Sequence, residues 1–272
     1  MENNEIIKFL KDNNFFPSKK LGQNFLLSND YKNKIVNLVP IDSNDFVLEI
    51  GPGFGALTDF IIKKTHNLTL IEFDKRLYEF LNKKYNQINI INHDILKLNL
   101  NEILDKNKFN KSIVISNLPY SISSQVLINL LKTSRIDCMV LMVQKEMADR
   151  ITSKVGSKKY NGFSILISLL ADVKKEFDVP STVFYPEPHV ISTVIKVIPK
   201  KKIDFDLYKM EKFLKICFLN KRKKLVNNLK TNFSKKTIYN CFNALNLDEN
   251  VRPEQLDKNQ YVLLMKEFKY GN

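Results

Sequence analysis

Short apolar runs that alternate with segments of helical spacing are the feature of this chain that most limits its fold. Runs rich in Val, Ile and Leu recur at residues 46–50, 68–71, 88–91, 113–115 and 139–143. Segments with helical spacing lie between them, as at residues 57–64, 75–84 and 121–132. This alternation predicts an α/β fold in which helices cover both faces of a mostly parallel sheet.

The alternation stops after residue 170. Residues 171–179 and 190–198 both have strand-like patterns, and a proline-containing loop rather than a helix joins them. They predict an antiparallel pair at the edge of the sheet. From about residue 204 the patterns are only helical. We therefore expect an α/β domain over residues 1–200, which begins with a short amphipathic helix within residues 1–20, and a small all-α domain over residues 201–272.

The charge balance favours a polyanionic partner. The formal net charge is +14, which suits nucleic acid. Nearly all of the positive charge is Lys, and an AT-rich genome would also raise the Lys content, so the position of the charges matters more than their number. No apolar run reaches the roughly 18 residues of a membrane span, and the charged N-terminus lacks the apolar stretch of a signal peptide. We expect a cytoplasmic protein with no membrane partner.

Metal chemistry is not expected. The three cysteines are far apart in sequence and the chain has only three histidines. Such spacing disfavours both a zinc site and a disulfide framework, and it predicts three reduced thiols.

Glycine is scarce in this chain, yet three of its seven glycines, Gly51, Gly53 and Gly55, follow the first predicted strand. Glycine at a strand-to-helix turn tolerates positive φ and lets the backbone approach a ligand closely. The run therefore predicts a loop that binds a nucleotide-like cofactor. Its G-x-G-x-G spacing differs from the G-x-G-x-x-G of dinucleotide sites, which disfavours NAD without excluding it.

Two further strand ends carry acidic residues suited to an adenosine-containing cofactor. Glu72 lies close to the roughly 20-residue spacing at which a carboxylate reaches ribose hydroxyls, and Asp74 competes for the same role. Asp94, after the third run, can accept a hydrogen bond from an adenine amine. His93 beside it is predicted to be a loop or packing residue.

The peptide Asn117-Leu118-Pro119-Tyr120 ends the fourth predicted strand, at the edge where open α/β sheets bind ligands. It suits methylation of an adenine N6, because that amine is a poor nucleophile until acceptors hold its two hydrogens. The Asn117 side-chain carbonyl and the Leu118 backbone carbonyl can be those acceptors, and Pro119 keeps Leu118 extended. Tyr120 offers a flat face to an unstacked base. We expect direct displacement from S-adenosylmethionine, without a metal or a covalent intermediate.

Two more segments are candidates for contacts with nucleic acid. Phe184 or Tyr185, in the loop between the late strands, can stack on the opposite face of the base or fill the core instead. Residues 212–247 contain no acidic residue, and within them a helix-borne basic cluster is predicted to contact phosphates rather than to be a solvated Lys face. The basic cluster consists of Lys221, Arg222, Lys223 and Lys224, and Lys145 and Arg150 would extend its surface.

Taken in order, these motifs resemble the ribosomal RNA adenine dimethyltransferases over nearly the whole chain. The similar segments are L-G-Q-N-F-L at residues 21–26, E-I-G-P-G-x-G at 49–55, N-L-P-Y at 117–120, Q-K-E-x-A-x-R at 144–150, V-F-x-P-x-P-x-V-x-S at 183–192 and R-P-E-Q-L at 252–256. The chain departs from the family pattern at Leu21, where an aromatic or basic residue is common, and in the position of the glycine within residues 160–164.

The resemblance implies a class I methyltransferase domain plus a small helical RNA-binding domain. It implies that the protein dimethylates N6 of two adjacent adenosines in a hairpin near the 3′ end of small-subunit (16S) rRNA, within the pre-30S particle, during ribosome biogenesis. Nothing in the sequence requires more than a monomer. The resemblance also implies a set of cofactor contacts, namely Asn24, Leu26, Gly51, Gly53, Glu72, Asp94 and Asn117.

Three alternatives stay open at this point. The large-subunit (23S) rRNA adenine methyltransferases of the macrolide-resistance type share the N-x-P-Y core, although the segment at residues 252–256 and the P-G-F-G loop favour the small-subunit branch. A non-catalytic rRNA-binding assembly factor would keep the basic surface but would have no need of Asn117, Tyr120 and Glu72. An NAD-dependent oxidoreductase would bind nicotinamide in the glycine loop.

Overall fold

The computed structural model describes residue 10, residues 15–105 and residues 109–270, which form two compact units. Unit 1 comprises the chain up to Ala148 together with Lys174–Pro199, and unit 2 comprises Asp149–Val173 together with the chain from Lys200. The helix expected within residues 1–20 lies largely outside the described residues. The division into functional domains at residue 200 stays a prediction.

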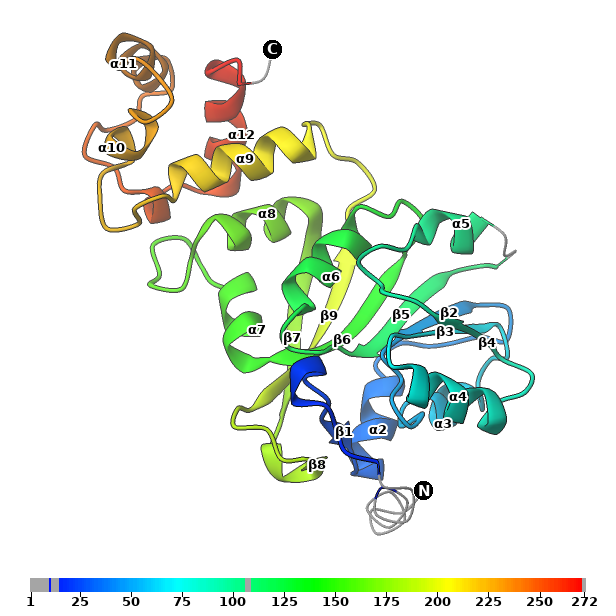
Figure 1. Ribbon diagram of the computed structural model, residues 1–272. Coiled ribbons are helices and arrows are strands. Elements are labelled where there is room, and N and C mark those ends of the chain that lie inside the picture. Colours follow the sequence, from blue (N-terminus) through cyan, green and yellow to red (C-terminus); the bar gives the residue numbers. More distant parts are fainter. Residues whose placement is uncertain (1–9, 11–14, 106–108, 271–272) are drawn as a thin grey trace. The chain divides into compact units, whose positions relative to one another are not determined.

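Unit 1 is built on a seven-stranded sheet with the order β4-β3-β2-β5-β6-β9-β7 (Figure 1). Strands β2 to β6 pair in parallel, and β9 pairs antiparallel with β6. The predicted mostly parallel sheet with an antiparallel edge is confirmed. The strands are β2 (Phe46–Ile50), β3 (Leu68–Glu72), β4 (Asn89–Asn92), β5 (Ser112–Asn117), β6 (Cys138–Gln144), β7 (Ala171–Val179) and β9 (Ser192–Pro199).

The central strands β2, β3, β5 and β6 are mostly apolar because both of their faces are buried. On one face, α2 (Asn29–Val36), α3 (Thr58–Ile61) and α4 (Lys75–Lys84) pack with the sheet in a single buried cluster. The neighbouring strand residues Val114 and Leu141, which point the other way, are also fully buried. Helices α5 (Leu100–Asp105) and α6 (Ser123–Leu131) complete the unit, and Figure 1 shows α6 lying over the sheet.

The sequence patterns did not predict a short antiparallel ladder. Strand β1 (Phe25–Leu26) pairs with β8 (Phe184–Tyr185), which follows a 3-10 turn at Ser181–Val183. Two residues are too few for a strand to show its period of two. The ladder ties the N-terminal segment to the loop between β7 and β9.

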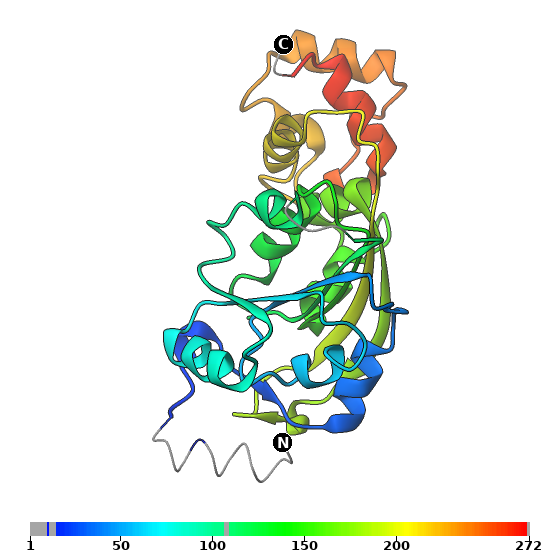
Figure 2. The same cartoon turned by 90° about the vertical axis from the view of Figure 1, so that its right-hand side faces the viewer.

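Unit 2 is helical. Helix α8 (Gly162–Leu170) packs against α9 (Leu207–Cys217) and α12 (Lys258–Glu267), and α10 (Leu225–Leu229) also packs against α9. The residues of α7 (Lys145–Ile151) are divided between the two units, and α11 (Lys235–Ala244) lies above α10 in Figure 1. Figure 2 shows the yellow-to-red helices of unit 2 from the side. The prediction that the chain is helical after about residue 204 is confirmed. None of the helices in the described ranges has the length and hydropathy of a membrane span.

The basic cluster lies in the turn that precedes α10, so the prediction that a helix carries it is wrong. Four successive basic residues offer no apolar face with which a helix could pack. Helix α10 begins only where the buried side chains of Leu225 and Val226 supply that face.

Candidate active site

A cavity of about 240 Å³ opens in unit 1 where β2, β3, β4 and β5 end. Ligands of parallel sheets bind at this edge because the strands present their carboxyl ends and loops there. The cavity is lined by nine of the predicted site residues: Asn24, Leu26, Gly51, Gly53, Glu72, Asp94, Asn117, Leu118 and Tyr120. The structure thus brings the predicted cofactor residues and the Asn117–Tyr120 peptide together.

The glycine loop takes a backbone conformation that side chains disfavour. Gly51, Gly53 and Gly55 have φ values of 63°, 60° and 82°, all in the left-handed region. A Cβ on Gly53 would also lie 3.1 Å from the ring of Phe25. The Gly53 N–H donates a hydrogen bond to Glu72 Oε2 at 3.2 Å, which couples this loop to the end of β3.

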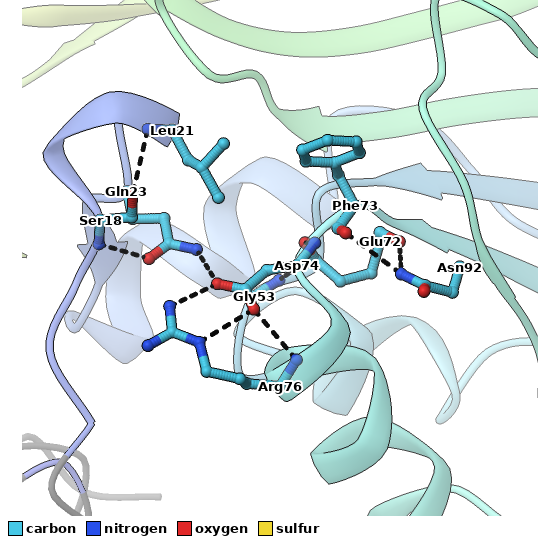
Figure 3. A network of polar contacts seen from close by, with 9 residues as sticks. All are labelled: Ser18, Leu21, Gln23, Gly53, Glu72, Phe73, Asp74, Arg76 and Asn92. Carbon is cyan, nitrogen blue, oxygen red and sulfur yellow. Dashed lines mark hydrogen bonds and ion pairs between the residues drawn. The ribbon is translucent and has the colours of Figure 1, made fainter.

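Glu72 and Asp74 differ in their hydrogen bonds (Figure 3) and in their position at the cavity. Asp74 caps α4 and is held by Arg76, whose guanidinium lies 2.6 Å from Asp74 Oδ2, so its pKa is lowered. Gln23 Nε2 donates to the same oxygen at 2.9 Å. Glu72 instead lines the cavity, whereas Asp74 is not among the lining residues.

Glu49 is a site residue that the sequence analysis did not single out. It is only 2% exposed, lines the cavity, and accepts a hydrogen bond from Thr58 Oγ1 at 2.6 Å. Burial raises the pKa of Glu49 to about 8 and that of Glu72 to about 7. An acidic residue inside the apolar run at residues 46–50 was the available signal. Two buried carboxyls favour a ligand that brings positive charge.

The Asn117–Tyr120 peptide has the acceptors that its proposed chemistry needs. Asn117 Nδ2 donates to the Asn24 carbonyl oxygen at 3.2 Å, and none of the described residues donates to Asn117 Oδ1. The Leu118 N–H donates to the Met142 carbonyl oxygen at 3.1 Å, which holds this peptide at the end of β5. Asn117 Oδ1 is therefore available to accept from a ligand.

Tyr120 is fixed through its hydroxyl group. Its oxygen lies 2.6 Å from Ser192 Oγ at the start of β9, and burial raises its pKa. The phenol therefore stays neutral near pH 7 and is not a general base. What it offers to the cavity is its ring.

The N-terminal segment crosses the cavity and is held at several points. Gln23 Oε1 accepts from the Ser18 N–H at 2.7 Å while its amide nitrogen binds Asp74. The ring of Phe25 lies 4.7 Å from that of Phe54 in the glycine loop, measured between centroids. Gln23 is a second cavity residue that the sequence analysis did not single out; its place in the L-G-Q-N-F-L motif was the available signal.

Of the two remaining candidates, Asp94 lines the cavity and Phe184 does not. Asp94 Oδ1 accepts from the Leu96 N–H at 3.0 Å. Phe184 is 3% exposed, belongs to the buried cluster of the sheet and does not line the cavity, while Tyr185 is half-buried. A stacking role for Phe184 stays a prediction.

None of the predicted RNA-binding residues lines the cavity. Lys145 pairs with Asp178, and the guanidinium of Arg150 lies 5.5 Å from the centre of the Phe163 ring. Within the basic cluster, Lys221 is half-buried and donates to the Lys158 carbonyl oxygen, whereas Arg222, Lys223 and Lys224 are exposed. Three of these cations are therefore open to solvent.

Comparison with known proteins agrees with this geometry. The model of the family described as "Ribosomal RNA adenine dimethylase" matches residues 15–270. The chain belongs to the ribosomal RNA adenine dimethylase family. It is 48% identical over 268 residues, covering 98% of this chain and 97% of the relative, to the ribosomal RNA small subunit methyltransferase A of Malacoplasma penetrans. The corresponding protein of Ureaplasma urealyticum is 44% identical, covering 97% of this chain and 95% of the relative.

Solved structures extend the family comparison. A dimethyladenosine transferase from Plasmodium falciparum is similar with a TM-score of 0.77 and 28% identity, covering 90% of this chain and 97% of that one. The 23S rRNA methyltransferase ErmE has a TM-score of 0.66 but 19% identity, covering 90% of this chain and 99% of that one, so it shows a common fold alone.

As a member of this family, the protein is an S-adenosylmethionine-dependent rRNA adenine dimethyltransferase. The predicted enzyme class and cofactor are confirmed. The cavity residues fit that cofactor, because two buried carboxyls face a ligand that carries a sulfonium and an amino group. The positive-φ glycines leave room for its close approach.

Proposed function

We propose that this protein dimethylates N6 of two adjacent adenosines in a hairpin near the 3′ end of small-subunit (16S) rRNA. The observation that carries the proposal is the free Asn117 Oδ1 beside the Leu118 carbonyl, in a cavity that also holds Glu72 and the glycine loop. The choice of the small subunit is supported by relatives with that printed name, at 38–48% identity over most of their length.

The cofactor residues have separable roles. Glu72 accepts hydrogen bonds from the ribose hydroxyls, and Asp94 accepts from the adenine amine. Gly51 and Gly53 let the backbone lie against the ligand, while the Asn24–Leu26 segment closes over it. When bound, S-adenosylmethionine supplies an electrophilic methyl group.

The Asn117–Tyr120 peptide prepares the target base. Asn117 Oδ1 and the Leu118 carbonyl accept the two hydrogens of N6 and leave the lone pair of the nitrogen free to attack. Tyr120 supports one face of the base, and Phe184 supports the other if the loop after β7 turns its ring outward. Each transfer makes N6 cationic, and the nitrogen then releases one proton to solvent. In the second transfer N6 starts with only one hydrogen, so one acceptor suffices and the pocket must accommodate a methyl group.

RNA is held mainly outside the cavity. The helical domain at residues 201–272 binds rRNA phosphates through the basic cluster, and Lys145 and Arg150 add contacts. The methyltransferase domain at residues 1–200 performs the transfer. We propose that the protein acts as a cytoplasmic monomer on the pre-30S particle.

Labelled cofactor and unmethylated small and large ribosomal subunits test this proposal. We expect label at two adjacent adenosines near the 3′ end of the small-subunit rRNA and none in the large subunit. Label confined to the large subunit would favour the macrolide-resistance alternative. Rescue of subunit assembly without any label would favour the alternative of a non-catalytic rRNA-binding assembly factor.

A further inference from the structure

A cluster of polar side chains on the far side of the glycine loop has no role in the function described so far. Asp59 of α3, Lys84 at the end of α4 and the adjoining Tyr85 form it, and we call it the loop clamp. Lys84 Nζ lies 2.9 Å from Asp59 Oδ2, and the Tyr85 hydroxyl donates to Asp59 Oδ1 at 2.5 Å. Asp59 therefore joins the side chains of Lys84 and Tyr85.

The loop clamp also binds the backbone of the glycine loop. Lys84 Nζ donates to the Phe54 carbonyl oxygen at 3.2 Å, and the Tyr85 hydroxyl lies 3.3 Å from the Gly55 carbonyl oxygen. A Cβ on Gly55 would collide with the Tyr85 ring, so the approach of ring and loop requires glycine there. Tyr85 is 7% exposed, and burial raises its pKa, so its hydroxyl keeps the proton that it donates.

The two sides of the loop face different partners. Gly51, Pro52 and Gly53 line the cavity, whereas Phe54 and Gly55 do not. The Gly53 N–H is held from the cavity side by Glu72, and the Phe54 carbonyl is held from the opposite side by Lys84, where the Tyr85 hydroxyl lies against the Gly55 carbonyl. The positive-φ conformation of the loop is thus fixed from both sides.

We infer that Asp59, Lys84 and Tyr85 are positioning residues that set cofactor affinity by holding the glycine loop in its binding conformation. They touch no substrate, so their loss leaves the transfer step intact once the cofactor is bound. The inference rests on the proposed function only in that the cavity is the cofactor site. Losing one or two of these hydrogen bonds weakens cofactor binding about tenfold.

The test compares Tyr85→Phe and Lys84→Met with two matched controls on α4, Tyr78→Phe and the exposed neighbour Lys83→Met. S-adenosylhomocysteine binding is measured by calorimetry, and KM for S-adenosylmethionine and kcat are measured on small subunits. We expect Kd and KM to rise about tenfold in both clamp variants, with kcat unchanged and both controls like wild type. Lys84→Arg, which keeps a cationic donor, should recover most of the affinity.

The outcomes separate this inference from the proposed function. A wild-type protein that binds no S-adenosylhomocysteine refutes the cofactor site itself. Normal wild-type binding together with unchanged Kd in both clamp variants overturns the inference alone. A lower kcat with unchanged KM in the clamp variants also overturns the inference. Melting temperatures show which variants are folded, and Asp59→Asn, which keeps the size of the side chain, provides a third clamp variant.

Discussion

Cofactor affinity should rise as Glu72 loses its proton. In the folded protein this carboxyl is 6% exposed and its pKa is raised to about 7 by burial, against 4.5 for an exposed Glu. An ionised carboxylate accepts ribose hydroxyls more strongly than a neutral one. We therefore expect affinity for S-adenosylhomocysteine to increase as pH rises through about 7 and to level off about one unit above it.

The magnitude follows from the two hydroxyls that Glu72 would hold. A hydrogen bond to a charged group contributes roughly 1 kcal/mol more than a neutral one, so Glu72→Gln should cost about 2 kcal/mol, or about 30-fold in Kd, at high pH. The same substitution removes the ionisable group. Its Kd should therefore change little with pH.

The stability of the unliganded protein should run in the opposite direction. Because the folded pKa of Glu72 is raised, its contribution to the free energy of unfolding is fully present below pH 4.5 and is lost as pH rises through about 7. The shift corresponds to about 3 kcal/mol. A rise in affinity with pH thus cannot be ascribed to a more stable protein.

Calorimetry with S-adenosylhomocysteine from about pH 6 to about pH 9 measures both effects. Glu79→Gln, on the exposed side of α4, is the matched control and should behave like wild type. Glu49→Gln removes the second buried acid, and the rise in S-adenosylhomocysteine affinity near pH 7 should persist in this variant. A flat wild-type profile, or full affinity in Glu72→Gln, would refute the assignment of Glu72 as the ribose acceptor.

Three further predictions concern the transfer step and RNA binding. Asn117→Ala should lower kcat at least about 100-fold, with S-adenosylhomocysteine affinity kept within a few-fold; unimpaired methylation would rule out its acceptor role. Phe184→Ala should lower the melting temperature through a loss of about 3–5 kcal/mol, since the ring is 3% exposed, and unchanged melting with reduced kcat would favour stacking instead. Replacing the four residues of the basic cluster with Gln should raise KM for small subunits and weaken the dependence of that KM on salt, while the Kd of the cofactor stays the same. Replacement of Lys235 and Lys236 with Gln is the control and should leave both quantities unchanged.

Much of unit 1 was predictable because its signals are local. Period and composition predicted the strands between residues 46 and 143 to within a residue or two, since strands buried on both faces are mostly apolar. The Gly51–Gly55 run and the Asn117–Tyr120 peptide each follow a strand, so sequence order alone places both at one edge of the sheet. The motif resemblance supplied the family.

Other features exist only once distant segments meet. Glu72 and Asp74 lie two residues apart at the end of the same strand, so the sequence does not distinguish their roles. The structure shows that Asp74 accepts hydrogen bonds from Arg76 and Gln23, whereas Glu72 lines the cavity. The pairing of β1 with β8 and the loop clamp likewise join residues that no local pattern relates.

The sequence by itself determined the sheet, the cofactor loop and the acceptor peptide, because hydrophobic period, glycine conformation and strand order are properties of neighbouring residues. The tertiary structure alone decided which acid lines the cavity, where the basic cluster lies and what holds the glycine loop. Those outcomes depend on burial and on hydrogen-bond partners that folding brings from elsewhere in the chain.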